Sequence, residues 1–167
     1  MLLAIDVQYE EDSALAAGVL FSSWDSATPD KSIIKEISGI EPYEAGSFYK
    51  RELPCILDII AEVNLDQIEA IIVDGHVFID NDKNHGLGGY LYEELDRTIP
   101  IIGVAKRAFH KNEKTNIPVQ RGESTNPLYV SAIGMDPKSA AEKVQNMHGE
   151  FRMPTLLQIL DTETKKP

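Results

Sequence analysis

The chain contains a single cysteine, Cys55, among its 167 residues. One thiol cannot form an internal disulfide and excludes a zinc site built from several cysteines. Its place among apolar positions predicts a core thiol, and so few cysteines favour a reducing, cytoplasmic compartment. Long apolar runs are also absent, since none approaches the roughly 20 residues that cross a bilayer. The apolar start has no basic residue and is interrupted by Asp6, which is typical of a buried strand and not of a signal peptide.

Basic residues are scarce, with 16 Lys and Arg against 27 Asp and Glu and a net charge of −11. This balance argues against a generic nucleic-acid binder, which usually has a basic face. Residues 106–121 differ, because they contain five basic side chains and one acid. The five are Lys106, Arg107, Lys111, Lys114 and Arg121. This segment is expected either to bind the phosphates of DNA or RNA or to be a solubilising hairpin.

Hydrophobic patterning alternates strands with helices and predicts one α/β domain over residues 1–167, with a mixed sheet flanked by helices. The expected strands are 2–7, 14–21, 32–40, 70–73, 99–105 and 128–133. The expected helices are 48–63 and 87–95, one that starts at Asp136-Pro137, and one that opens at Pro154. Pro54 fits the first helix only if it lies in the first turn.

Four acids occupy positions that the pattern otherwise keeps apolar: Asp6, Glu52, Asp74 and Asp161. Asp6 interrupts the first strand and Asp74 ends the strand at 70–73, while the other two continue apolar helix stripes. A buried carboxylate is costly unless it is paired. Each acid alone is best explained as a loop cap or an ion-pair partner. Together they are expected to bind a cation, and oxygen ligands suit Mg²⁺ or Mn²⁺.

Six separated blocks then resemble the endonuclease V family, which has a ribonuclease H-like fold. The blocks are Ala4-Ile5-Asp6-Val7, Pro42 to Gly46 with Arg51 to Pro54, Val73 to His76, Ile102 to Lys106, Pro127 to Ser131, and Arg152 to Asp161. Their order and spacing match across nearly the whole chain. The resemblance implies a divalent-metal phosphodiesterase that acts on DNA or RNA with deaminated purines, chiefly inosine.

The same resemblance implies roles for individual residues. Asp6 and Asp74 would bind the metal most directly, with Glu52 and Asp161 completing the set, and Lys106 would lie near the scissile phosphate.

The substrate positions implied by the resemblance are Tyr43, Gly46, Gly75 and His76. Tyr43 matches the residue that separates the strands, and the two glycines match backbone positions near the extruded base. His76 is expected either to contact substrate or metal or to stabilise its loop by hydrogen bonds.

The chain departs from the family pattern mainly at substrate positions. Glu44-Ala45 stands where the family has Ile-Pro, and residues 77–83 have two acids where the family has two arginines. Two further hypotheses therefore remain: a hydrolase of another phosphate ester or nucleic-acid structure, and a catalytically silent binding module on the same fold.

Overall fold

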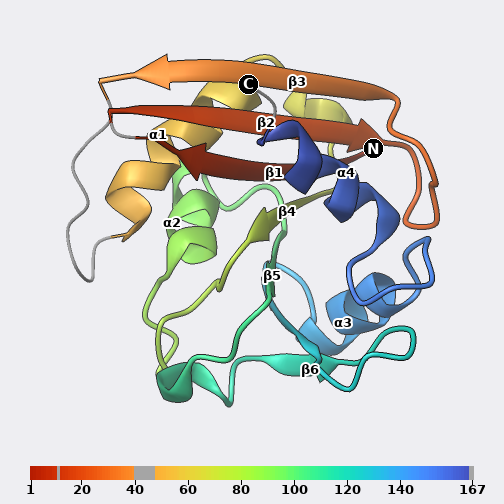
Figure 1. Cartoon of the computed structure of the whole chain (residues 1–167). Helices are drawn as coiled ribbons and strands as arrows, with labels where there is room; N and C mark the ends of the chain where they lie inside the picture. The colour runs from red at the N-terminus through yellow and green to blue at the C-terminus, as the bar shows by residue number, and fades with distance from the viewer. Residues whose placement is uncertain (11, 40–47, 166–167) are drawn as a thin grey trace.

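The computed structural model describes residues 1–10, 12–39 and 48–165 of the chain. Tyr43 and Gly46, together with the Glu44-Ala45 departure, lie outside the described residues. The described strands form one seven-stranded sheet in the order β3-β2-β1-β4-β5-β7-β6 (Figure 1). The central strands β1, β4 and β5 are parallel, whereas β2, β3, β7 and β6 pair antiparallel with their neighbours. The mixed sheet expected from the sequence is therefore confirmed.

The strands are β1 (Leu2–Tyr9), β2 (Ser13–Phe21), β3 (Lys31–Ser38), β4 (Ala70–Asp74), β5 (Ile101–Ala105), β6 (Ile117–Val119) and β7 (Leu128–Ile133). The α-helices are α1 (Phe48–Ile60), α2 (Leu87–Glu94), α3 (Pro137–Gln145) and α4 (Thr155–Glu163). Short 3₁₀ turns, η1 (Leu65–Gln67) and η2 (His110–Asn112), lie in the connections. None of the helices among the described residues is long and apolar enough to cross a membrane.

The two faces of the sheet carry separate apolar cores. On one face, Leu2, Ala4 and Ile72 pack with α3 and α4. On the other, Leu3 and Ile5 pack with α1 and α2. Alternate residues of a strand point to opposite faces, so this division fixes the face of every β1 and β4 side chain. In consequence Asp6, in phase with Leu2 and Ala4, belongs to the α4 side.

Two local predictions are wrong. β6 was not expected, because its three residues include Pro118 and are too short for a clear alternation. Pro54 lies well inside α1 and not in its first turn, so the helix lacks one backbone donor there. The buried stripe of Cys55, Ile56 and Ile59 stabilises α1 against the sheet despite that loss.

Candidate active site

Asp6 and Asp74 lie side by side at the edge of the sheet towards which the central parallel strands β1 and β4 run. Strands β1 and β4 are parallel, and Ile5 pairs with Val73, so the next residue of each strand is an aspartate. Both side chains are in phase with the α4 face. Asp6 is only 7% exposed, and its Oδ1 accepts a hydrogen bond from the Val7 N–H at 2.9 Å. The strand register alone thus brings two carboxylates together.

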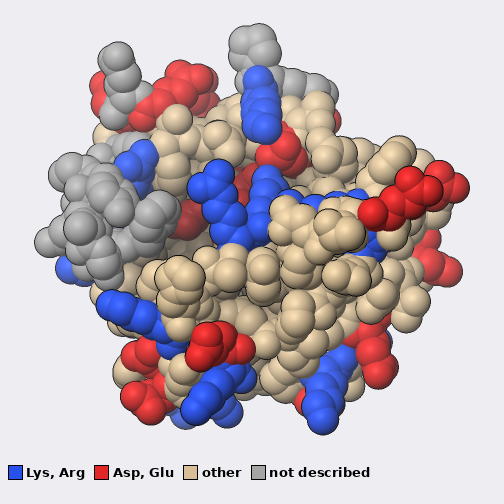
Figure 2. All heavy atoms as spheres, turned by 60° about the horizontal axis from the view of Figure 1, so that its bottom comes forward, with Lys and Arg blue, Asp and Glu red and all other residues tan. Residues whose placement is uncertain are grey.

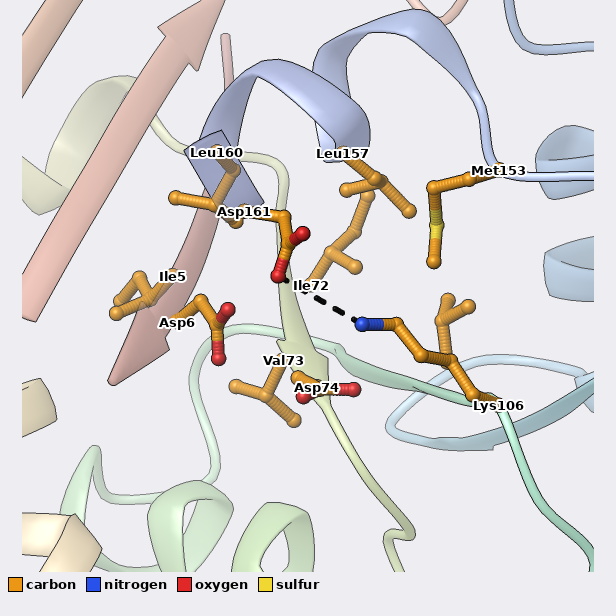
Figure 3. A pocket seen from close by; sticks show the side chains of 11 residues that line it. Ile5, Asp6, Ile72, Val73, Asp74, Lys106, Met153, Leu157, Leu160 and Asp161 are labelled. Atoms are coloured by element: carbon orange, nitrogen blue, oxygen red, sulfur yellow. Dashed lines mark ion pairs between the residues drawn. The ribbon is translucent and has the colours of Figure 1, made fainter. Parts of the chain in front are cut away.

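Asp161 and Lys106 complete a small pocket over these aspartates. Figure 3 shows the Asp6, Asp74 and Asp161 carboxylates and the Lys106 ammonium directed into one space. Asp161 comes from α4 and Lys106 follows β5, and Lys106 Nζ lies 3.7 Å from Asp161 Oδ1. The other Asp161 oxygen accepts from Lys165 Nζ at 2.9 Å. The cavity volume of about 30 Å³ gives room for a cation or one or two waters, not for a nucleobase.

The back of the pocket is apolar. Leu157 and Leu160 of α4 line it together with Ile72 and Val104 of the sheet, and Met153 closes one side (Figure 3). Charges act more strongly on one another where water is excluded. The apolar wall therefore strengthens the interactions of the buried Asp6, whereas Asp74 and Lys106 remain exposed to solvent.

Glu52 approaches the same edge from the opposite side of the sheet. It belongs to α1, which packs on the face away from α4, and it does not line the pocket. Its carboxylate nevertheless interacts electrostatically with Asp74 and Asp6. The acids thus converge from both faces on the ends of β1 and β4.

This convergence is unfavourable for ionised carboxylates. Burial, followed by the charge of Asp74, raises the pKa of Asp6 to about 7. Burial, followed by Asp74 and Asp6, raises the pKa of Glu52 to about 8. Burial also raises the pKa of Asp74, although Lys106 opposes this shift. The cluster therefore holds negative charge only at a cost that a nearby cation would relieve.

The donor chemistry of this cluster fits a hard divalent cation. Carboxylate oxygens are the ligands that Mg²⁺ and Mn²⁺ prefer, and burial together with neighbouring acids raises the pKa values of Asp6 and Glu52. Within the described ranges, however, no group of three acidic, His or Cys side chains is already gathered closely enough to hold a metal ion. Placement on two faces of the sheet explains why Glu52 stands apart.

Two loops that leave this edge are joined to each other. His76 follows Asp74, and its ring nitrogens lie 3.2 Å from Asn116 Oδ1 and 3.2 Å from the Arg107 carbonyl. The buried Asn112 donates to the Phe78 carbonyl at 2.7 Å. His76 does not line the pocket. Its observed contacts are those of a loop-stabilising residue, which was the simpler of its two predicted roles.

Two glycines allow the loop that follows Asp74 to lie close against strand β5. Gly75 has φ +123°, a conformation that side-chain-bearing residues rarely adopt. At Gly103 of β5, a Cβ atom would lie 2.5 Å from the Gly75 carbonyl oxygen and 2.9 Å from Ser131 Oγ. The backbone after Asp74 therefore lies directly against β5, which holds Asp74 and Lys106 in fixed relation.

The prediction of an exposed basic segment is wrong for Arg121. This side chain is 5% exposed, and its guanidinium donates only to backbone carbonyls. The acceptors are Gln145, Met147, Gly149, Phe151 and Arg152. The other four basic residues of the segment are exposed. On the face shown in Figure 2, some Lys and Arg side chains lie near the middle and others lie towards the lower outline, where Asp and Glu lie beside them.

Arg152 was not predicted from the sequence to have a role at this site. Its guanidinium donates to the carbonyls of Lys106, Asn126 and Pro127. It thereby fixes the backbone of Lys106 next to the segment that leads into α4. The hydrogen bond between Arg152 and the Lys106 carbonyl joins residues 46 positions apart, so no local pattern predicts it. The sequence indicated Arg152 only through its place in the last matching block.

Comparisons with known proteins agree with this geometry. The family model described as Endonuclease V matches residues 1–161. Two curated relatives, both endonuclease V from strains of Thermus thermophilus, are 26% identical over 145 residues. The match covers 73% of this chain and 62% of each relative. The chain thus matches less than two thirds of the length of these relatives.

Solved structures show the same fold. The catalytic domain of human endonuclease V has a TM-score of 0.79 at 21% identity, over 98% of this chain and 80% of that one. Endonuclease V from Bacillus subtilis gives 0.80 at 17% identity, over 98% and 78%. The Ciona intestinalis enzyme, solved with a 24mer DNA containing an inosine, gives 0.79 at 15%, over 98% and 83%. The ribonuclease H-like architecture expected from the sequence is confirmed.

Proposed function

The chain belongs to the endonuclease V family, and on that basis we propose that it is a Mg²⁺- or Mn²⁺-dependent endonuclease acting on DNA or RNA with deaminated purines such as inosine. The observation that carries this proposal is that Asp6 and Asp74, each directly after the last paired residue of the adjacent parallel strands β1 and β4, line one pocket with Lys106 and Asp161. A Mg²⁺ ion bound there would activate water and stabilise charge on the phosphate oxygens.

The residues that would hold the cation are Asp6 and Asp74, with Glu52 and Asp161 beside them. Asp6 and Asp74 present their oxygens from neighbouring strands, and Glu52 reaches the same edge from α1. The metal ligands remain a proposal, supported by the all-oxygen donor set and by the raised pKa values of these acids.

Lys106 is proposed to hold the phosphate that is cut. Its ammonium is directed into the pocket and pairs with Asp161 (Figure 3). Asp161 also pairs with Lys165. A phosphate oxygen near the pocket mouth can share the Lys106 ammonium with Asp161. The small cavity admits a phosphate oxygen and excludes bases, so the base must be recognised outside it.

Inosine is proposed as the recognised base because of the family and because the Ciona intestinalis relative is described with inosine-containing DNA. An activity of this kind would serve nucleic-acid repair, in the reducing cytoplasm that the lone, buried Cys55 favours.

The test is cleavage of labelled single- and double-stranded oligonucleotides, with and without one inosine, in Mg²⁺ or Mn²⁺. We expect wild-type protein to cut only inosine strands, and Asp74→Asn to lose at least 1000-fold, on the order of 4 kcal/mol of transition-state stabilisation. Glu69→Gln, an exposed acid before β4, is the matched control and should retain activity. Undiminished cleavage by a folded Asp74→Asn variant would contradict the assignment.

A silent binding module is the second candidate, favoured by one observation. In the portion of the chain that is described, no three possible ligands are already gathered around one point. Calorimetric titration with Mn²⁺ separates the two functions. The enzyme is expected to bind the ion, and Asp6→Asn should weaken that binding, whereas a silent module would release no heat in either protein.

A further inference from the structure

A second concave surface lies on the far side of the loop that follows Asp74, towards the end of the sheet at which β5 begins and β7 ends. This groove, which we call the lysine groove, has a volume of about 690 Å³. It is lined by Phe78 and Lys83 from that loop, by Lys114 and Ile117 before and within β6, and by Met135 before α3 and Lys138 in its first turn. Neither the pocket acids nor Lys106 contribute to it.

The groove is positively charged within an acidic protein. Lys83, Lys114 and Lys138 are exposed, and no acid among the described residues forms an ion pair with any of them. Asp136 also lines the groove, but its carboxylate caps α3 by accepting from the Lys138 N–H and the Ser139 hydroxyl. The lining therefore carries three ammonium groups against one carboxylate, a positive balance.

The groove is rigidly connected to the candidate active site. One wall belongs to the loop after Asp74 and the opposite wall to the segment after Lys106. These are joined by the Asn112 bond to the Phe78 carbonyl and by the Lys114 N–H, which donates to Asn81 Oδ1 at 2.8 Å. The lysines are thus held at a set separation from the pocket, as a second contact on one extended ligand requires.

The floor of the groove is apolar. Phe78 is 7% exposed, and Ile117 and Met135 are partly buried. Single-stranded nucleic acid suits such a groove, because the lysines can contact its backbone phosphates while its bases pack on the apolar floor. A small anion would use the ammonium groups but not the floor.

We propose that the lysine groove binds the sugar-phosphate backbone of a single nucleic-acid strand, several nucleotides away from the phosphate held at Lys106. This inference rests on the proposed function, which places a strand at Lys106, and it adds a second contact on the same strand. With this second contact, affinity would increase with the length of the strand. The base would be recognised in the region around Gly75 and not in the groove.

The test compares two triple variants that remove the same charge. The groove variant is Lys83→Gln/Lys114→Gln/Lys138→Gln. The control is Lys31→Gln/Lys35→Gln/Lys143→Gln, whose positions on β3 and on a part of α3 outside the groove leave the lining unchanged. Binding of short and long labelled single strands, each with one inosine, is measured by fluorescence anisotropy in EDTA over a series of KCl concentrations.

We expect wild-type and control proteins to bind the long strand at least tenfold more tightly than the short one. The groove variant should lose this gain, and its slope of log K against log salt should fall by about 2, since each single-strand phosphate contact contributes roughly 0.7. Equal behaviour of the two triple variants would overturn the inference, as would failure of wild-type protein to bind either strand.

Parallel cleavage assays with Mg²⁺ keep the two proposals distinguishable. If wild-type protein cuts the inosine strand while the groove variant binds long strands like the control, the groove inference is wrong and the proposed function stands. If the groove variant alone loses affinity for long strands while nothing is cut, the groove binds nucleic acid and the proposed hydrolysis is wrong.

Discussion

Asp6 at the sheet edge and Arg121 under the α3–α4 connection are almost equally buried, at 7% and 5% exposure. Asp6 lies next to other acids, and one backbone N–H and the more distant Lys106 offset its charge only in part. Arg121 donates to five carbonyls, whose negative ends surround the guanidinium. The arginine is therefore satisfied by the chain itself, whereas the aspartate needs a cation that the chain does not supply.

This contrast distinguishes a buried charge that supports the fold, Arg121, from one that serves the function, Asp6. A buried charge that is fully hydrogen-bonded holds its surroundings in one arrangement. A buried acid among acids lowers stability and is retained where its chemistry is used. The following predictions test this contrast.

The largest effect on stability is expected for Arg121→Met. Five carbonyls lose their donor, and an unsatisfied buried polar group costs about 1–3 kcal/mol. Because water would hydrate some of these carbonyls in the variant, we expect the free energy of unfolding, measured with urea, to fall by about 3 kcal/mol. Arg107→Met, at an exposed position of the same segment, should change stability by less than about 0.5 kcal/mol. Equal losses in the two variants would remove the distinction between them.

In metal-free buffer, Asp6→Asn is expected to increase the free energy of unfolding, whereas Arg121→Met decreases it. The folded-state pKa of Asp6 is raised from 3.8 to about 7, so protonation favours the folded state and ionisation opposes it. Wild-type stability should fall between pH 4 and pH 7, and the fall should be smaller in the variant, where only Glu52 and Asp74 still titrate with raised pKa values. We expect Asp6→Asn to be more stable than wild-type protein at pH 8, by a margin that disappears at pH 4. Glu36→Gln, an exposed acid on β3, is the control.

Divalent cations should remove the penalty at the sheet edge. At a Mg²⁺ concentration ten times its dissociation constant, binding to the folded state adds about 1.4 kcal/mol. Thermal unfolding at pH 8 should show this gain for wild-type protein and much less for Glu52→Gln or Asp6→Asn. Arg121→Met should keep the gain, because its defect lies elsewhere. A gain of the same size in all variants would place the ion at another site.

The smallest effect is expected for Arg152→Gln, which connects the two regions. Its guanidinium holds the Lys106 carbonyl next to the α3–α4 connection. We expect about 1 kcal/mol of lost stability and a several-fold lower kcat with little change in KM, because Lys106 would be less well positioned. Arg152→Lys should restore part of the kcat. A change confined to unfolding would show that Arg152 supports the fold alone.

Local pattern was enough to locate most of the elements and the acids of the site. Asp6 and Asp74 stand out because each breaks an apolar strand, and the register of β1 with β4 confirms that they meet. Pattern failed where packing overrides local preference, as at Pro54 within α1, and where a strand is as short as β6.

Charge counted along the chain was a poor guide to exposure. Arg121 closes a basic segment in the sequence, yet the structure buries it against carbonyls from residues 145–152. Glu52 lies in the apolar stripe of α1, as the spacing predicts, but its approach from the face opposite α4 could not be inferred. The contacts that decide both cases join residues distant in sequence.

The alternation of strands and helices, the two aspartates that follow apolar strand residues and the family could all be read from the chain, since they depend on local periodicity and on short motifs. Which acids share a face, which basic residues reach solvent, and which lysines line one groove became known from the folded structure. Burial and electrostatic fields depend on distances in space, which the packing of the two sheet faces sets.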